Sequence, residues 1–329
     1  MMYVWLLIGF VLLIKGADFF VDGSSSVAVH LRVPTIIIGL TVVAFGTSMP
    51  EASVSITAAM QGRNGLAVSN VIGSNIFNTL VVLGASALVA PIRPQRGVMR
   101  REYPFSILMT GLLILFMMMP FQAGRFAEAL QNKETFSLGR LGGLVLLGFF
   151  VWYVVSAVKS ALAYRRAGRI VGEPGEDEIK PLPPLRCALY ILGGLAGIIY
   201  GGDRVVSSAS AIARAFGLSE TFIGLTIVAL GTSLPELVTS VVASKKGAND
   251  LAIGNVIGSN IFNILLILGA SSAIHPIKIS GDSVCDAACL LLISIVTYLS
   301  ARGEKGITRK EGILFLAMYG GYFAYILGR

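Results

Sequence analysis

The sequence predicts an all-α integral membrane protein with ten transmembrane helices, arranged as two inverted five-helix repeats. Three observations support this fold class. Of the 329 residues, 55% are hydrophobic and only 13% are charged, whereas a soluble domain averages about 25% charged residues. The chain contains apolar segments of about 20 residues, the length that crosses a bilayer. It also contains an internal duplication, which constrains the architecture more than any single segment does.

The duplication relates residues 38–92 to residues 223–277. The first copy begins IGLTVVAFGTSMPE, the second begins IGLTIVALGTSLPE, and both contain NVIGSNIFN. The copies align without a gap at a constant offset of 185, with 33 of 55 positions identical. The same offset relates the Gly-Ala-Asp sequence at 16–18 to the Gly-Gly-Asp sequence at 201–203. The two halves are therefore expected to share one fold.

Ten apolar segments are expected to span the membrane, five in each half. They are residues 2–21, 35–59, 66–90, 102–120 and 139–160, then 186–209, 221–244, 251–275, 284–301 and 309–327. Because five is odd, the second half enters the membrane from the opposite face, as in an inverted repeat. We divide the chain into an N-terminal repeat (1–164), a linker (165–184) and a C-terminal repeat (185–329). The first segment has no basic leader, so we expect it to be a retained helix rather than a signal peptide.

Basic residues set the predicted orientation. Loops on one side of the ten spans carry more than twice as many Lys and Arg residues as loops on the other side, and the richer side faces the cytoplasm. This places the 165–184 linker in the cytoplasm and both termini outside. The net charge of +8 has the same explanation. We expect the lipid bilayer as surroundings, no nucleic-acid partner and no obligate protein partner.

Two carboxylates fall in the middle of predicted spans. Glu51 and Glu236 occupy equivalent positions in the duplicated motif. A charge at the bilayer centre costs about 2.5–3.5 kcal/mol on insertion scales, and neither motif contains a Lys or Arg to offset it. A bound cation or protons are therefore expected as the counter-charge. A pair of protonated structural acids is the alternative.

Each glutamate follows a proline. Pro50 and Pro235 lack an N–H and would clash with the carbonyl four residues earlier, at Gly46 and Gly231. We expect both helices to break within the Gly-Thr-Ser-x-Pro sequence. Carbonyls freed inside a membrane are tolerated only where they are buried in protein or line a cavity. Broken helices at the midplane of inverted repeats are where secondary transporters bind ions.

The repeated polar groups offer oxygen ligands and include no Cys or His. Such ligands suit hard cations rather than zinc, copper or iron. Two bidentate carboxylates and two freed threonine carbonyls would supply about six oxygens, which lies within the range that calcium takes. The hydroxyl and amide oxygens around the acids could instead hold smaller monovalent ions. No cofactor is expected, because the bound ions would be transported rather than retained.

The paired GTSMPE/GTSLPE and NVIGSNIFN motifs in a ten-span chain resemble the sodium/calcium exchanger family of the cation/calcium antiporter superfamily, in its compact prokaryotic form. The resemblance covers nearly the whole chain. It implies a secondary active antiporter, not an enzyme, that exchanges calcium for sodium across the membrane by alternating access. In that family the first and sixth spans slide across the core, which implies the same motion for residues 2–21 and 186–209.

The resemblance also implies a role for each motif residue. As calcium ligands it indicates Glu51, Glu236 and the carbonyls of Thr47 and Thr232. As sodium ligands it indicates both glutamates with Ser48, Ser74, Ser233, Ser259 and the carbonyls of Ala44 and Ala229. Asn78, Asn263, Pro50 and Pro235 would flank the site.

Two features of the motifs bear on the coupling ion. Asn263 stands where many relatives carry Asp, which argues against potassium dependence. Calcium/proton relatives typically carry an acid in the Gly-Asn motif of the third and eighth spans. In this chain that motif runs from Asn70 to Asn75 and from Asn255 to Asn260 and contains no acid, so sodium is favoured over protons. Calcium/proton antiport is the alternative function. A channel and an intramembrane hydrolase are disfavoured, because the chain is one pseudo-symmetric unit with two acids and has no H-E-x-x-H or G-x-S-x-G pattern.

Overall fold

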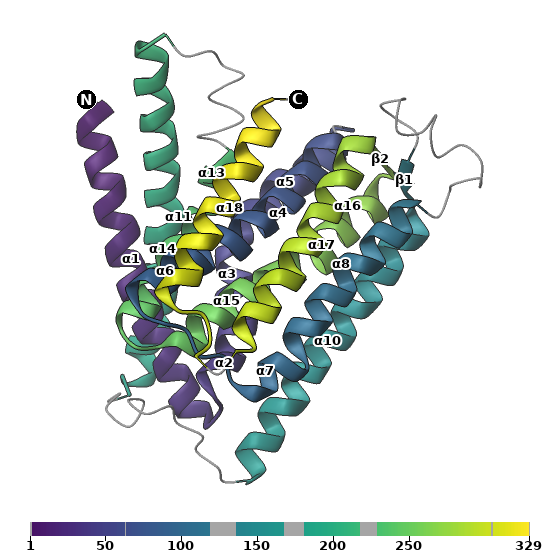
Figure 1. Ribbon diagram of the computed structural model, residues 1–329. Coiled ribbons are helices and arrows are strands. Elements are labelled where there is room, and N and C mark those ends of the chain that lie inside the picture. Colours follow the sequence, from purple (N-terminus) through teal and green to yellow (C-terminus); the bar gives the residue numbers. More distant parts are fainter. Residues whose placement is uncertain are drawn as a thin grey trace.

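The computed structural model describes residues 2–62, 64–118, 136–167, 181–217, 229–303 and 305–328, and most of them are helical (Figure 1). The first half contains α1 (Met2–Leu31), α2 (Thr35–Ile38), the π-helix η1 (Gly39–Val43), α3 (Ala44–Thr47), α4 (Met49–Met60), α5 (Asn64–Phe77), η2 (Asn78–Val82), α6 (Leu83–Val89), α7 (Arg96–Arg100), α8 (Glu102–Met118), the strand β1 (Phe136–Leu138) and α10 (Arg140–Ala167). The second half contains α11 (Pro184–Ala215), α13 (Ala229–Gly231), α14 (Leu234–Lys245), α15 (Asn249–Phe262), η5 (Asn263–Leu268), α16 (Gly269–Ile274), β2 (Ile277–Ile279), α17 (Gly281–Ala301) and α18 (Arg309–Leu327).

Seven of the described helices are long and apolar enough to cross a membrane, and an eighth span is broken. In the broken span, Thr35–Thr47 and Met49–Met60 are bent by 50° relative to each other. These eight match eight of the ten predicted spans. Helices α14 and α18 lie at the other two predicted positions and are not among the eight. Residues 221–228, the beginning of the predicted seventh span, lie outside the described ranges, as do most of the 121–138 loop and of the 165–184 linker.

The helices built from the duplicated NVIGSNIFN motif form the centre of the molecule. In the apolar stretch of Asn249–Ile274, 94% of the residues are buried, and in that of Gly65–Val89 the share is 78%. The other long spans are between 17% and 39% buried. The repeat-equivalent helices η2 and η5 continue these central spans as single π-helical segments, which often occur at functional sites. Most of the duplicated polar residues on these two helices are therefore buried inside the protein.

The two helices that begin the halves, α1 and α11, pack side by side at one edge of the molecule (Figure 1). Glycines make the close approach possible, as small residues do between membrane helices. A Cβ atom added to Gly16 would lie 2.8 Å from the carbonyl oxygen of Gly194. One added to Gly201 would lie 2.8 Å from the carbonyl oxygen of Gly9. The Gly-Ala-Asp sequence at 16–18 and the Gly-Gly-Asp sequence at 201–203, which extend the duplication, therefore each begin with a glycine of this contact between α1 and α11.

Helix α1 is longer than the sequence indicated. It continues to Leu31 instead of ending near residue 21. Its last part contains Ser24, Ser25 and Ser26, which lie beyond the predicted span, yet all three are buried in the structure. Tertiary contacts hold this part of the helix, because Ser26 accepts a hydrogen bond from the backbone N–H of Leu182 at 3.3 Å.

Two short pairings between loops were not predicted, because segments of three residues or fewer carry no readable pattern. Strands β1 and β2 are antiparallel, with Phe136 opposite Ile279. An isolated bridge joins Ile92 to Ile307. Each pairing joins two loops that the predicted topology places on the same side of the membrane.

Candidate ion-binding site

The structure breaks the motif helices where the sequence predicted. Helix α3 ends at Thr47, and α4 begins at Met49 with Pro50 in its first turn. In the second half, α13 ends at Gly231 and α14 begins at Leu234. A proline has no N–H to give to the carbonyl four residues earlier, so the backbone turns at these points. The turns carry the serines that precede the prolines into the centre of the protein.

The two breaks are connected by a reciprocal pair of hydrogen bonds. The hydroxyl of Ser48 donates to Oε1 of Glu236 at 2.9 Å. The hydroxyl of Ser233 donates to Oε1 of Glu51, also at 2.9 Å. All four side chains are buried. The partners are related by the same offset of 185 that relates the sequence copies, so the halves build one shared site rather than two.

Each glutamate keeps its second oxygen free. Within the described part of the chain, Oε2 of Glu51 and Oε2 of Glu236 are buried without a hydrogen-bond partner. The Oδ1 atoms of Asn78 and Asn263 are also buried without a partner. Buried oxygens of this kind carry a cost unless something pairs with them. A set of carboxylate and amide oxygens in equivalent positions fits a hard cation.

The amide groups of Asn78 and Asn263 are held by other asparagines of the duplicated motif. Nδ2 of Asn263 donates to Oδ1 of Asn75 at 2.9 Å, and Nδ2 of Asn78 donates to Oδ1 of Asn260 at 3.4 Å. Asn260 also donates to the hydroxyl of Thr79 at 2.9 Å. Because the amide nitrogens are used in these contacts, the amide oxygens of Asn78 and Asn263 remain as acceptors.

A second pair of asparagines fixes the glutamate helices to the central helices. Nδ2 of Asn70 donates to the hydroxyl of Ser55 at 3.0 Å, and Nδ2 of Asn255 donates to that of Ser240 at 2.9 Å. Each Nδ2 also lies 3.4 Å from the backbone carbonyl oxygen of the glutamate in its own half. Sequence reasoning assigned no such role to Asn70 and Asn255. Their repetition in both copies was the signal that could have found them.

The remaining predicted serine and threonine side chains differ in whether they contact the glutamates. Ser259 donates to Oε1 of Glu236 at 3.5 Å. The hydroxyl groups of Ser74 and Thr232 are buried and have no partner within the described ranges. The hydroxyl of Thr47 instead donates to Oδ1 of Asn255 at 3.0 Å.

The two alanine carbonyls and the second proline were also predicted around the site. The carbonyl of Ala44 already accepts the backbone N–H of Ser48 at 3.1 Å. Ala229 begins α13, and its side chain lies outside the described residues. Pro235 is buried in the first turn of α14.

Comparison with known proteins identifies relatives over nearly the whole chain. Residues 1–159 and 187–328 match the family described as sodium/calcium exchanger protein. The putative antiporter CaxA of Alkalimonas amylolytica is 40% identical over 324 residues, which cover 97% of this chain and 96% of that protein. The inner membrane protein YrbG of Escherichia coli strain K12 is 35% identical over 327 residues, which cover 98% and 94%.

Solved structures agree with the sequence relatives. A structure of the sodium-calcium exchanger NCX_Mj, soaked with zero Na+ and Ca2+, matches this chain with a TM-score of 0.80 and 31% identity, covering 98% of each chain. The helical membrane fold is therefore that of the exchanger. Together with the family match over both halves, this shows that the chain belongs to the sodium/calcium exchanger protein family.

Proposed function

We propose that this protein is a secondary active antiporter that exchanges calcium for sodium by alternating access and catalyses no chemical reaction. The observation that carries the proposal is the reciprocal arrangement of Glu51 and Glu236, each with one oxygen bonded to a serine of the other half and one oxygen free. Two carboxylates offer a charge of −2, which one calcium ion neutralises. Membership of the exchanger family and the likeness to NCX_Mj support the choice of ions.

The proposed site uses the residues named from the motifs. Calcium is bound by Glu51 and Glu236 with the backbone carbonyls of Thr47 and Thr232. Sodium is bound by the same glutamates with Ser48, Ser74, Ser233, Ser259 and the carbonyls of Ala44 and Ala229. Asn78 and Asn263 flank the centre, and Pro50 and Pro235 hold the breaks open. The free oxygens and the reciprocal serine contacts support this set.

The proposed architecture is ten spans in two inverted repeats, over residues 1–164 and 185–329, joined by a cytoplasmic linker at 165–184. The loop pairings of β1 with β2 and of Ile92 with Ile307 support it, because each joins loops assigned to one side. We place the protein in an inner membrane with both termini outside. The relative named as an inner membrane protein supports this location.

The direct test is calcium uptake into vesicles that contain the purified protein. We expect an outward sodium gradient to drive uptake, with no requirement for potassium, because positions 78 and 263 supply neutral asparagine amides instead of a further carboxylate. Glu51→Gln protein in matched vesicles serves as the inactive control. Uptake that ignores sodium and follows an imposed pH gradient would instead establish calcium/proton antiport.

A further inference from the structure

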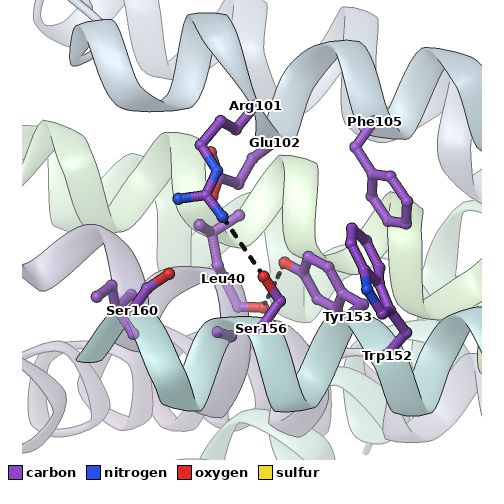
Figure 2. Close-up of a pocket in the computed structure, with 10 residues that line it drawn as sticks. Leu40, Arg101, Glu102, Phe105, Trp152, Tyr153, Ser156 and Ser160 are labelled. Carbon is purple, nitrogen blue, oxygen red and sulfur yellow. Dashed lines mark hydrogen bonds between the residues drawn. The ribbon is translucent and has the colours of Figure 1, made fainter. Parts of the chain in front are cut away.

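A cavity of about 250 Å³ lies at the edge of the molecule opposite α1 and α11, where α8 and α10 meet the broken span. One end of it is polar and carries Arg101, Glu102, Ser156 and Ser160. Figure 2 shows the Arg101 guanidinium directed at Ser156, with Glu102 beside it. None of these four residues belongs to the proposed ion site.

Arg101 and Glu102 attract each other electrostatically but form no ion pair in the described part of the chain. Nη2 of Arg101 donates to the Ser156 hydroxyl at 3.4 Å, which leaves its other N–H groups available. Glu102 follows directly in the chain and is half-buried. In the described ranges, neither side chain has an ion-pair partner within 4 Å. A positive and a negative group therefore stand side by side, each able to take an external partner.

The cavity continues into an apolar groove between the same two helices. The groove has a volume of about 610 Å³ and shares Phe105 and Trp152 with the polar cavity. Its other lining residues are Leu108, Met109, Leu112, Val145, Gly148 and Phe149. Leu108 is 63% exposed and Trp152 is 57% exposed, so the groove opens toward the surrounding bilayer. A Cβ atom at Gly148 would meet no atom within 4 Å, which shows that the glycine leaves space there.

The polar cavity and the groove together match one leaflet in length. Helix α8 rises about 1.5 Å per residue, so Leu112 lies about 15 Å along the helix axis from Glu102. Half of a hydrocarbon core of about 30 Å is about 15 Å. The polar cavity therefore lies at headgroup level when the groove reaches the bilayer centre.

We propose that this cavity and groove bind a phospholipid whose zwitterionic headgroup carries a primary ammonium, as in phosphatidylethanolamine. Arg101 and the two serines bind the phosphate, and Glu102 binds the ammonium. One acyl chain lies in the groove. The charge pattern selects this headgroup, because Glu102 repels a headgroup that carries only negative charge. The apolar continuation selects a lipid over a soluble phosphate, since only an acyl chain gains from filling it.

The test compares two lipids on the full-length protein in detergent, by native mass spectrometry. Equal amounts of dioleoyl phosphatidylethanolamine and dioleoyl phosphatidylglycerol are offered together. We expect the first to be retained at least about fivefold over the second. Equal retention of both lipids would overturn the proposal. Glycerophosphoethanolamine, the headgroup without acyl chains, is expected not to displace the bound lipid at equal concentration, and displacement would contradict the role of the groove.

Two variants assign the preference to this site. Gly148→Leu fills the groove and is expected to bring the retention ratio close to one. Gly321→Leu on α18 is the matched control, because Gly321 is also exposed and has nothing within 4 Å of an added Cβ; the ratio should not change. Glu102→Gln removes the ammonium partner and should lower the ratio at least threefold. An unchanged ratio in Gly148→Leu or in Glu102→Gln would show that the lipid binds elsewhere.

Discussion

Ser48 donates its hydroxyl hydrogen to Glu236 across the interface between the two halves, at 2.9 Å. The serine stands at the helix break of the first half, and the carboxylate belongs to the first turn of α14 in the second. The mirror contact from Ser233 to Glu51 has the same length. Each half therefore positions the glutamate of the other half. A change at the helix break of one half is expected to alter the position of the carboxylate in the other half.

The first prediction concerns these serines. Ser48→Ala and Ser233→Ala should each lower the apparent affinity for sodium and calcium by about 10-fold or more, because a hydrogen bond to a charged group contributes about 1.5–3 kcal/mol. Sodium-dependent calcium uptake at varied ion concentrations measures the change. Ser86→Ala is the control, since Ser86 is buried but makes no side-chain hydrogen bond in the described structure. Unaltered affinities in both site variants would contradict the reciprocal arrangement.

The second prediction concerns the acids themselves. Glu51→Gln and Glu236→Gln should each abolish calcium uptake, because one remaining carboxylate cannot balance a desolvated divalent ion. The symmetry of the site predicts equal losses in the two variants. Size-exclusion chromatography in detergent checks that the variants remain folded, and Asp282→Asn, a change at an exposed position on α17, should transport normally. Near-normal uptake by either glutamine variant would remove that glutamate from the site.

The third prediction concerns Asn263→Asp. Nδ2 of Asn263 donates to Oδ1 of Asn75 at 2.9 Å. An aspartate keeps that hydrogen bond only when it carries a proton. Calcium uptake by this variant should therefore be highest at low pH and fall as pH rises and the proton is lost. Asn78→Asp, whose parent contact with Asn260 is longer at 3.4 Å, should show a weaker dependence. Identical pH profiles for Asn263→Asp and the unsubstituted protein would count against the amide network.

The helix breaks and the paired acids could be predicted from the sequence, for local physical reasons. A proline removes a donor wherever the chain places it, so Pro50 and Pro235 predict breaks without knowledge of the fold. A glutamate in an apolar segment demands a partner, so Glu51 and Glu236 indicated a polar centre. The duplication then predicted that the two acids would have equivalent surroundings, which the reciprocal serine contacts confirm.

The contacts between the halves could not be predicted in the same way. Helical spacing relates residues three or four apart on one helix, but nothing in it pairs Ser48 with Glu236 or Asn263 with Asn75. Those pairs depend on how helices from the two halves pack against each other in the folded protein. The end of α1 shows the same limit, because the predicted span stopped at residue 21, whereas the helix continues to Leu31 with Ser24, Ser25 and Ser26 buried.

The fourth prediction concerns orientation. The charge distribution predicts that the 165–184 linker lies in the cytoplasm, so a cysteine introduced at Gly175 should resist membrane-impermeant thiol reagents in intact cells. Cysteines introduced at the two ends of the chain should react. The background for this experiment must first lose Cys187, Cys285 and Cys289. Labelling at position 175 without labelling at the ends would reverse the proposed orientation.

The last prediction concerns the contact between α1 and α11. It compares two neighbouring glycines of α11, of which Gly194 lies in the contact and Gly193 does not. An alanine Cβ at Gly194 would lie 2.6 Å from the backbone nitrogen of Phe20 and 2.7 Å from the carbonyl oxygen of Gly16. One at Gly193 would meet nothing within 4 Å. Gly194→Ala must therefore push the two helices apart, and we expect a loss of about 1–3 kcal/mol, as in other overpacked interiors. Gly193→Ala should cost nothing of this kind, because it adds the same methyl group to the same helix without a contact. Thermal unfolding of the purified proteins in one detergent measures the difference, with a lower midpoint expected for Gly194→Ala alone. Equal midpoints for the two variants would show that α1 and α11 are free to separate at no cost, and the close glycine contact would then contribute nothing to stability.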